Sequence, residues 1–404
     1  MSSQQPHSQI RKRRVFYIPG YDPIHPRRYR ELYRKEARIQ AEISGYEIDI
    51  RAKTGEGPYG WHVTSQQDGA LVETEVEVLV WSDIVRDSMA QSIPATYLQL
   101  ARTAWIYIAT GALWRLMRLR KGPVIAALYP VAMLLLQLAA GLAVAWGVFA
   151  VLHPLAGWAG LLPAGGAAYV LMHWFRKLDN RLFAYYLMHD YAHSAQLKGA
   201  YSAELQTRLN QFSDLIAEAL QTDVDEVLVV GHSSGAHLGV SVLAQLLQQR
   251  AAAPTGPALS FLTLGQVVPM VSFLPRAHRL RADLRYLSGH PELTWVDISA
   301  PGDGCAFALC DPVAVSGVAG PDRRWPLVLS AAFTQTLSPA RWKQLRWRFF
   351  RLHFQYLCAF DHPGDYDYFR ITAGPRTLRH RFADRAPSRS RIERPVSKYT
   401  SVAA

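Results

Sequence analysis

The sequence predicts an α/β fold in which a mostly parallel sheet carries helices on both faces and is interrupted by a two-helix transmembrane hairpin. One observation is the apolar run 226–230, which leads through a glycine-containing turn into residues 236–247, where apolar positions recur at helical spacing. A second is that further short apolar runs alternate with helical patterns along the chain. The third, which predicts the hairpin, is that residues 122–175 contain no Asp, Glu, Lys or Arg.

Composition favours a membrane-associated protein in a reducing compartment. The 404 residues are 50% hydrophobic and include 11 tryptophans, and the formal net charge is +12. The basic residues form clusters, which beside apolar spans are more typical of a cytoplasmic membrane face than of a nucleic-acid site, so we expect no nucleic-acid partner. Three cysteines give no disulfide framework and no zinc-type spacing.

The first part of the split domain is expected at residues 13–97, after a polar and disordered N-terminus at residues 1–12. Arg14–Ile18 has the pattern of a buried strand and ends in the turn Pro19-Gly20-Tyr21. Residues 98–121 have helical periodicity with two tryptophans and a basic end, which predicts one amphipathic helix at a membrane surface.

The apolar run 122–175 is long enough for two spans of about 20 residues each. We expect spans at Val124–Val151 and Leu155–Phe175, with the break at His153-Pro154. A buried core hairpin, or a hairpin that enters the membrane without crossing it, is the alternative.

Basic residues flank both ends of this run, whereas its central turn is uncharged, so the positive-inside rule places both ends in the cytoplasm. Two spans therefore keep residues 13–97 and the second part of the domain, residues 176–375, on one side of the membrane. The Arg-, Ser- and Pro-rich residues 376–404 are expected to form a basic, flexible, lipid-facing tail.

The candidate chemistry begins at the turn Gly231-His232-Ser233-Ser234-Gly235. A G-x-S-x-G turn between a strand and a helix forces the serine into a strained conformation and exposes its hydroxyl. The amide of the following residue, Ser234, then points to where an oxyanion would form. His232 is expected to be a packing or rim residue. An ordinary strand–helix turn is the alternative.

At these residues the chain resembles the lipase and esterase branch of the α/β-hydrolase superfamily, over about half of its length. The resemblance implies a nucleophile at Ser233 and a second oxyanion donor in the loop after an early strand, for which we expect the amide of Tyr21. It also implies the chain order serine, acid, histidine.

That order leaves a short set of candidates for the remaining catalytic residues. Asp303 follows a predicted strand and lies between two glycines, with Asp311 as the alternative acid. His353 lies in a largely apolar segment, with His362, in a polar turn, as the alternative base.

The expected activity is therefore that of a membrane-anchored serine ester hydrolase using Ser233, His353 and Asp303, with an acyl-enzyme intermediate. Its expected partners are the lipid bilayer and a lipid or acyl ester, and no metal or organic cofactor is required. An acyltransferase or thioesterase, or a catalytically inactive hydrolase-like membrane scaffold, is the alternative. The sequence leaves the oligomeric state open.

Overall fold

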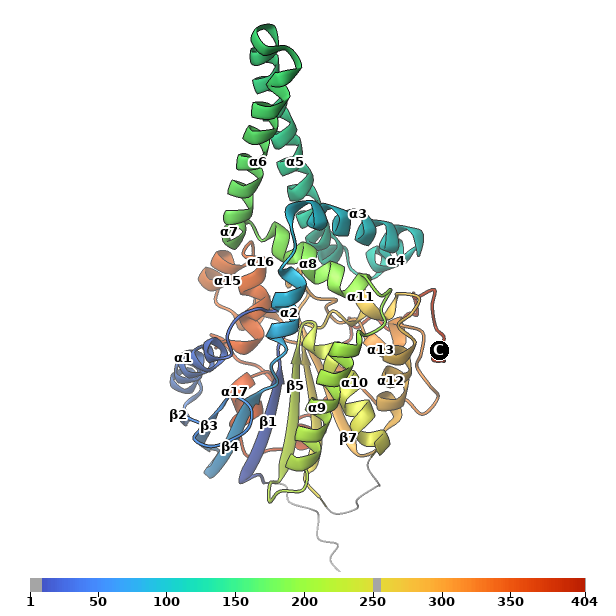
Figure 1. Ribbon diagram of the computed structural model, residues 1–404. Helices are drawn as coiled ribbons and strands as arrows, with labels where there is room; N and C mark the ends of the chain where they lie inside the picture. Colours follow the sequence, from blue (N-terminus) through green and yellow to red (C-terminus); the bar gives the residue numbers. More distant parts are fainter. Residues whose placement is uncertain (1–8, 250–255, 404) are drawn as a thin grey trace, which may run out of the picture.

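The computed structural model describes residues 9–249 and 256–403, and these residues form an α/β fold around one eight-stranded sheet (Figure 1). The strand order is β2-β3-β4-β1-β5-β6-β7-β8. Strands β4, β1 and β5 to β8 pair in parallel, whereas β2–β3 and β3–β4 are antiparallel. The predicted mostly parallel sheet is confirmed. The strands are β1 (Lys12–Ile18), β2 (Glu47–Ala52), β3 (Gly60–Gln67), β4 (Ala70–Val78), β5 (Glu226–His232), β6 (Ala258–Leu264), β7 (Leu293–Ser299) and β8 (Leu327–Ser330).

Both faces of the sheet are covered, because its central strands are apolar on both sides. Every residue of β5 is buried, with Val227 and Val229 in one hydrophobic cluster and Leu228 and Val230 in another. The helices that contribute to the first cluster are α2 (Ser82–Met89), α9 (Ala203–Ala219), α10 (Gly235–Gln249), α11 (Val268–Ser272), α12 (His278–Gly289) and α13 (Pro312–Val315). Those of the second are α1 (Arg27–Ser44), α14 (Phe333–Thr336), α16 (Phe349–His353), η2 (Phe354–Leu357), α17 (Tyr368–Ala373) and α18 (Leu378–Arg381).

The remaining helices gather above the carboxyl ends of the parallel strands (Figure 1). They are α3 (Ile93–Ala109), α4 (Ala112–Leu119), α5 (Lys121–Ala156), η1 (Gly157–Gly160), α6 (Leu161–Lys177), α7 (Asp179–Leu182), α8 (Ala184–Ala195) and α15 (Pro339–Leu345). Helix α8 packs against α3 and α5 and also contacts α2 and α11, two of the helices that cover the sheet.

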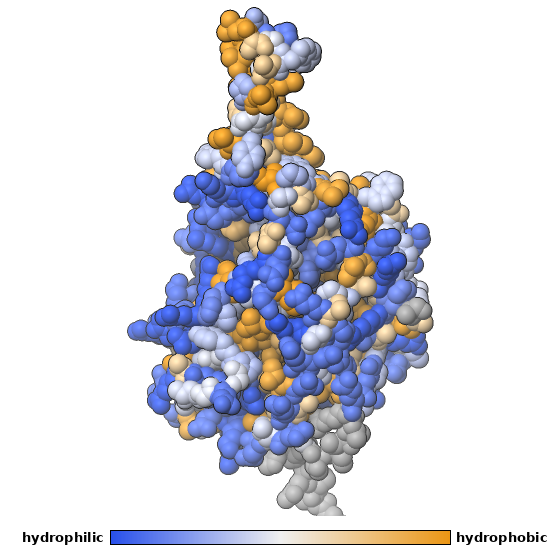
Figure 2. All heavy atoms as spheres, viewed as in Figure 1, coloured by the Kyte–Doolittle hydropathy of each residue, from blue (hydrophilic) through white to orange (hydrophobic). Residues whose placement is uncertain are grey.

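Helices α5 and α6 run side by side and project from the domain (Figure 1). Apolar residues dominate the surface of this projection (Figure 2). In the described part of the chain, Lys121–Lys177 is the one helical stretch long and apolar enough to cross a membrane, and only 17% of its most apolar window is buried. A core helix of a globular domain would be mostly buried, so the exposed stretch is consistent with membrane association.

Two predicted helix boundaries are wrong. The chain does not break at His153-Pro154: α5 continues to Ala156, and the reversal comes at Gly157, whose φ of 57° favours glycine. A proline in the last turn of a helix does not force an earlier end, because the preceding turns keep their hydrogen bonds. Residues 98–121 do not form one helix either: Gly111, at φ 73°, separates α3 from α4.

The C-terminal residues 376–403 pack along the domain, in contrast to the expected flexible tail. The amide of Ile392 donates to the carbonyl of Leu309, and that of Val396 to Val315. Arg281 donates to the carbonyl of Ser401. The backbone of this polar segment is therefore satisfied by distant partners that composition does not reveal. Of the N-terminus predicted to be disordered, residues 1–8 lie outside the described residues, and β1 already begins at Lys12.

Candidate functional site

Ser233 occupies the tight turn between β5 and α10, with a φ of 56° that non-glycine residues rarely adopt. The flanking residues Gly231 and Gly235 must be glycine, because neighbouring backbone atoms leave no room for a Cβ atom. A Cβ on Gly231 would lie 2.7 Å from the carbonyl oxygen of Gly235, and a Cβ on Gly235 would collide with the carbonyl oxygen of Ile18. Sterics within the turn and the close packing of β1 against Gly235 therefore hold the serine hydroxyl at the carboxyl end of the sheet.

The loop after β1 lies directly against this serine. A Cβ on Gly20 would lie 3.0 Å from the Cβ of Ser233, so the loop approaches as closely as a glycine allows. Gly20, Tyr21 and Ser234 line the same pocket as Ser233. The amides of Tyr21 and Ser234 donate no hydrogen bond to any group within residues 9–249 and 256–403. Both remain able to bind an oxyanion.

Asp303 and His353 form a buried hydrogen-bonded pair across 50 residues of sequence. His353 Nδ1 lies 2.7 Å from Asp303 Oδ2, which also accepts from the Tyr356 hydroxyl at 3.0 Å. Asp303 Oδ1 accepts from the amide of Cys305 at 2.9 Å. Burial alone would raise the pKa of Asp303, but the charge and hydrogen bond of His353, with the two other donors, hold that pKa below its ordinary value. Asp303 is thus an anion that fixes the imidazole ring.

His353 and Ser233 both lie beside the end of β6. Ser233 donates its amide hydrogen to the carbonyl of Leu264, and a Cβ on Gly265 would lie 3.1 Å from His353 Cε1. His353 Nε2 is buried and has no hydrogen-bond partner in the described chain, Ser233 included. Hydrogen bonds between a nucleophile and its base are often long in ligand-free enzymes, so this geometry is compatible with proton transfer once substrate binds.

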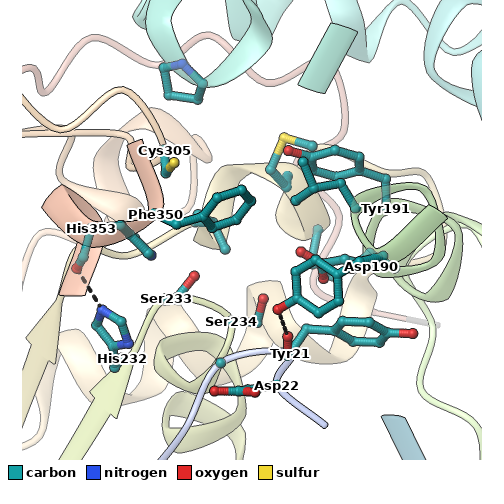
Figure 3. A pocket seen from close by; sticks show the side chains of 18 of the residues that line it. Tyr21, Asp22, Asp190, Tyr191, His232, Ser233, Ser234, Cys305, Phe350 and His353 are labelled. Atoms are coloured by element: carbon teal, nitrogen blue, oxygen red, sulfur yellow. Dashed lines mark hydrogen bonds between the residues drawn. The ribbon is translucent and has the colours of Figure 1, made fainter. Parts of the chain in front are cut away.

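His232 has a positioning role that the sequence did not indicate. Its Nε2–H donates to the backbone carbonyl of His353 at 3.0 Å, and the two rings lie 4.7 Å apart (Figure 3). Burial, then the nearby charge of His353, lowers the pKa of His232 to about 3, so it stays neutral and keeps its Nε2 hydrogen for this bond.

The pocket in front of Ser233 is narrow, with a cavity volume of about 80 Å³, and it opens to solvent. Its wall opposite the sheet comes from α8, the first turn of α5 and the α16 region (Figure 3). The residues of that wall are mostly apolar: Pro123, Tyr186, Leu187, Tyr191, Phe350 and Phe354. This wall offers apolar contacts beside the polar groups of Ser233 and His353.

Asp190, on α8, is the acidic exception in this wall. Its carboxyl makes no hydrogen bond within the described chain, and burial raises its pKa to about 7, an effect that His353 in its protonated form would partly offset. Sequence reasoning missed Asp190 because a single acid in a helix carries no motif.

The alternative residues lie elsewhere. Asp311 caps α13 by accepting from the amides of Val313 and Ala314, and it pairs with Arg323 at 3.1 Å. His362 is exposed, and its backbone amide bonds to Thr336. Neither residue lines the pocket.

Asp303, Cys305 and His353 place ligand atoms within 4.8 Å of one another, so they are also the residues that could hold a metal ion. Burial, followed by the charges of Asp303 and Asp190, raises the pKa of the Cys305 thiol well above its ordinary value. Both oxygens of Asp303 already accept hydrogen bonds, from His353, Tyr356 and the amide of Cys305. We interpret the group as a hydrogen-bonded Asp–His pair beside a thiol.

Comparison of the chain with protein-family models, with curated proteins and with solved structures gives no match. Function must therefore be argued from the site itself.

Proposed function

We propose that this protein is a membrane-anchored serine hydrolase of the α/β-hydrolase type that cleaves carboxylic esters of lipids. The observation that carries the proposal is His353, whose Nδ1 is held by Asp303 while its Nε2 is unpartnered in the pocket of Ser233. A nucleophile, a base and an orienting anion are the parts of an acyl-transfer site.

In the proposed reaction, Ser233 Oγ attacks the ester carbonyl carbon while His353 Nε2 accepts the hydroxyl proton. The amides of Tyr21 and Ser234 bind the resulting oxyanion, each donor contributing about 3 kcal/mol to the transition state. His353 gives its proton to the leaving alcohol as the C–O bond breaks, which leaves an acyl group on Ser233. Water then attacks this acyl group with His353 again as base, which releases the acid and restores the serine hydroxyl.

The position of the pocket at the base of the apolar projection supports a lipid substrate. The projection has an outgoing arm, α5, and a return arm, η1 with α6. Pro123 belongs to the first turn of α5, and α8 follows the return arm, so the base of the projection forms part of the pocket wall. If the projection lies in a bilayer, a lipid ester at the interface is close to Ser233.

We further propose that the projection crosses the membrane twice with the sheet domain in the cytoplasm. The return arm from Gly157 to Lys177 is about 30 Å long at about 1.5 Å per residue, which matches the bilayer's hydrocarbon core. Basic residues stand at both ends of the projection, and its turn is uncharged.

The chemistry is tested with a fluorophosphonate probe on the detergent-solubilised full chain. We expect labelling of the parent, none of Ser233→Ala, and unchanged labelling of the matched control Ser401→Ala, which alters an exposed hydroxyl far along the chain. Labelling that persists in Ser233→Ala would exclude Ser233 as the nucleophile. Products formed from long-chain esters, with and without added alcohol or thiol, separate hydrolysis from acyl transfer.

The topology is tested with a cysteine at Trp158, in the turn, and one at Leu71, on the sheet, in a parent without its native cysteines. An impermeant maleimide should label position 158 in intact cells and position 71 only after permeabilisation. Labelling of neither position before permeabilisation would exclude the double crossing.

A further inference from the structure

A basic aromatic segment, Lys343–Arg351, runs along the surface from the last turn of α15 into α16. Its aromatic side chains Trp347 and Phe349 are 73% and 48% exposed. Its four cations are exposed, and none lies within ion-pair distance of a carboxylate in the part of the chain that the structure describes; they are Lys343, Arg346, Arg348 and Arg351. The sequence contains no acidic residue from 338 to 360, so the positive charge is uncompensated locally.

This segment lies next to both ends of the apolar projection, at one end through Gly304 and at the other by direct contact. Near the outgoing arm, a Cβ on Gly122 would lie 3.4 Å from the Cα of Gly304, and a Cβ on Gly304 would lie 3.2 Å from Phe349 Cδ1. Near the return arm, the ring of Phe350 lies 4.9 Å from that of Phe183, which directly follows α7. In Figure 1, α15 and α16 accordingly sit beside α7 at the base of the projection.

The position of the segment relative to a bilayer follows from these contacts. If the projection is embedded as proposed above, its two ends lie at the lipid–water interface. A segment that contacts the chain after α7 directly, and lies next to the start of α5 through Gly304, lies close to the same depth. Tryptophan is favoured at that depth, and clustered Lys and Arg attract anionic headgroups. Two exposed aromatic rings among four unpaired cations have the chemistry of such a contact.

We propose that the basic aromatic segment docks on anionic phospholipid headgroups as a membrane contact separate from the projection. The inference rests on the proposed membrane insertion. It also links the lipid surface to the site, because Phe350 lines the pocket and His353 follows Arg351 by two residues. Lipid bound here would lie at the pocket wall that α16 contributes.

The test uses the full chain in lipid nanodiscs, with an environment-sensitive fluorescent amino acid in place of Trp347 and brominated lipids as quenchers. We expect quenching at position 347 to be about twofold stronger in discs containing phosphatidylglycerol than in phosphatidylcholine discs. The triple variant Arg346→Gln, Arg348→Gln, Arg351→Gln should lose this difference. The matched control carries the probe at Leu71, exposed near the start of β4 and thus at the opposite end of the sheet, and should stay unquenched.

Quenching at 347 that equals the Leu71 control, or that is the same in both lipid compositions, would overturn the proposal. A probe at Leu142, exposed on α5, separates this failure from failure of membrane insertion. If position 142 is quenched and 347 is not, the projection is embedded and the docking proposal is wrong; if neither is quenched, the membrane insertion is wrong as well. A response of position 347 to added transfer RNA, and not to anionic lipid, would make the partner a nucleic acid and refute lipid docking.

Discussion

Replacing Asp303 by asparagine tests the proposed site at the point where its geometry is most constrained. The carboxylate accepts three hydrogen bonds, from His353 Nδ1, the Tyr356 hydroxyl and the Cys305 amide. An asparagine amide keeps one acceptor oxygen and introduces an NH₂ group, so at least one of these donors faces another donor. If NH₂ faces His353, Nδ1 must become the acceptor and Nε2 must carry the hydrogen.

In that tautomer His353 cannot accept the proton of Ser233. Loss of the orienting carboxylate in a serine–histidine–acid site lowers kcat by about 10⁴, or about 5 kcal/mol in activation free energy. We therefore expect Asp303→Asn to slow both p-nitrophenyl ester hydrolysis and fluorophosphonate labelling at pH 8 by a factor of about 10³ to 10⁴.

The matched control is Asp311→Asn, which changes the other candidate acid in the same way. Asp311 caps α13 and pairs with Arg323, outside the pocket, so its loss should lower thermal stability but leave the labelling rate within about threefold of the parent. A folded Asp303→Asn protein labelled at the parent rate would refute the assigned role of Asp303.

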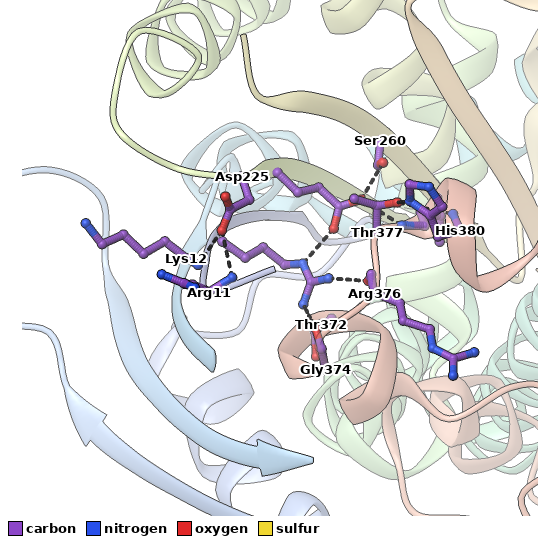
Figure 4. Close-up of polar contacts among 12 residues, drawn as sticks. Arg11, Lys12, Asp225, Ser260, Thr372, Gly374, Arg376, Thr377 and His380 are labelled. Atoms are coloured by element: carbon purple, nitrogen blue, oxygen red, sulfur yellow. Dashed lines mark hydrogen bonds and ion pairs between the residues drawn. The ribbon is translucent and has the colours of Figure 1, made fainter. Parts of the chain in front are cut away.

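Three further predictions concern the frame around the site. Gly235→Ala should abolish labelling and lower the Tm, because its Cβ collides with the backbone of Ile18; a parent-like Tm would contradict this packing. Glu226→Gln should lower the free energy of unfolding by about 3 kcal/mol, because Arg13 loses its buried charged partner. Arg13 and Glu226 also bind the backbone of the C-terminal segment at Arg376 and Leu378, so the variant should release this segment faster to trypsin (Figure 4). Unchanged cleavage would argue that the Arg13–Glu226 pair does not hold the segment. Burial raises the pKa of Asp297 to about 7 in the folded protein, against about 4 in the unfolded chain. Below pH 4 the protonated carboxyl makes its full contribution to the free energy of unfolding, and this contribution is lost as the pH rises through 7. Asp297→Asn should therefore raise the Tm at pH 8 and leave it unchanged at pH 4, and an equal shift at both pH values would contradict the burial argument.

The sequence was sufficient where structure depends on neighbours along the chain. The strand and helix on either side of Ser233 follow from local apolar periodicity, and Gly231 is needed by the turn itself, whereas Gly235 is needed because β1 packs against it. The apolar projection was visible as a charge-free run, because the lack of charge is a property of composition. Its exact reversal at Gly157 was missed, since proline and glycine both interrupt helices and packing decides which one does.

For contacts between residues far apart in the chain, the sequence limited the number of candidate partners but did not identify the pair. The chain order implied by the resemblance, together with the local setting of each residue, left two preferred candidates each for the acid and the base. Only the folded chain brings Asp303 against His353 and turns Asp311 toward a helix terminus. The bond from His232 to the carbonyl of His353 joins residues 121 positions apart and has no local signature.

What the sequence determined by itself, then, is the set of elements: the alternating strands and helices, the strained serine turn and the apolar projection. The tertiary structure alone decided which distant groups meet, including the placement of Asp190 in the pocket wall and the packing of residues 376–403 on the domain. The physical reason is that backbone conformation is selected by local sterics and periodic burial. The partners of a buried polar group, by contrast, are selected by the packing of the whole chain, which short stretches of sequence do not encode.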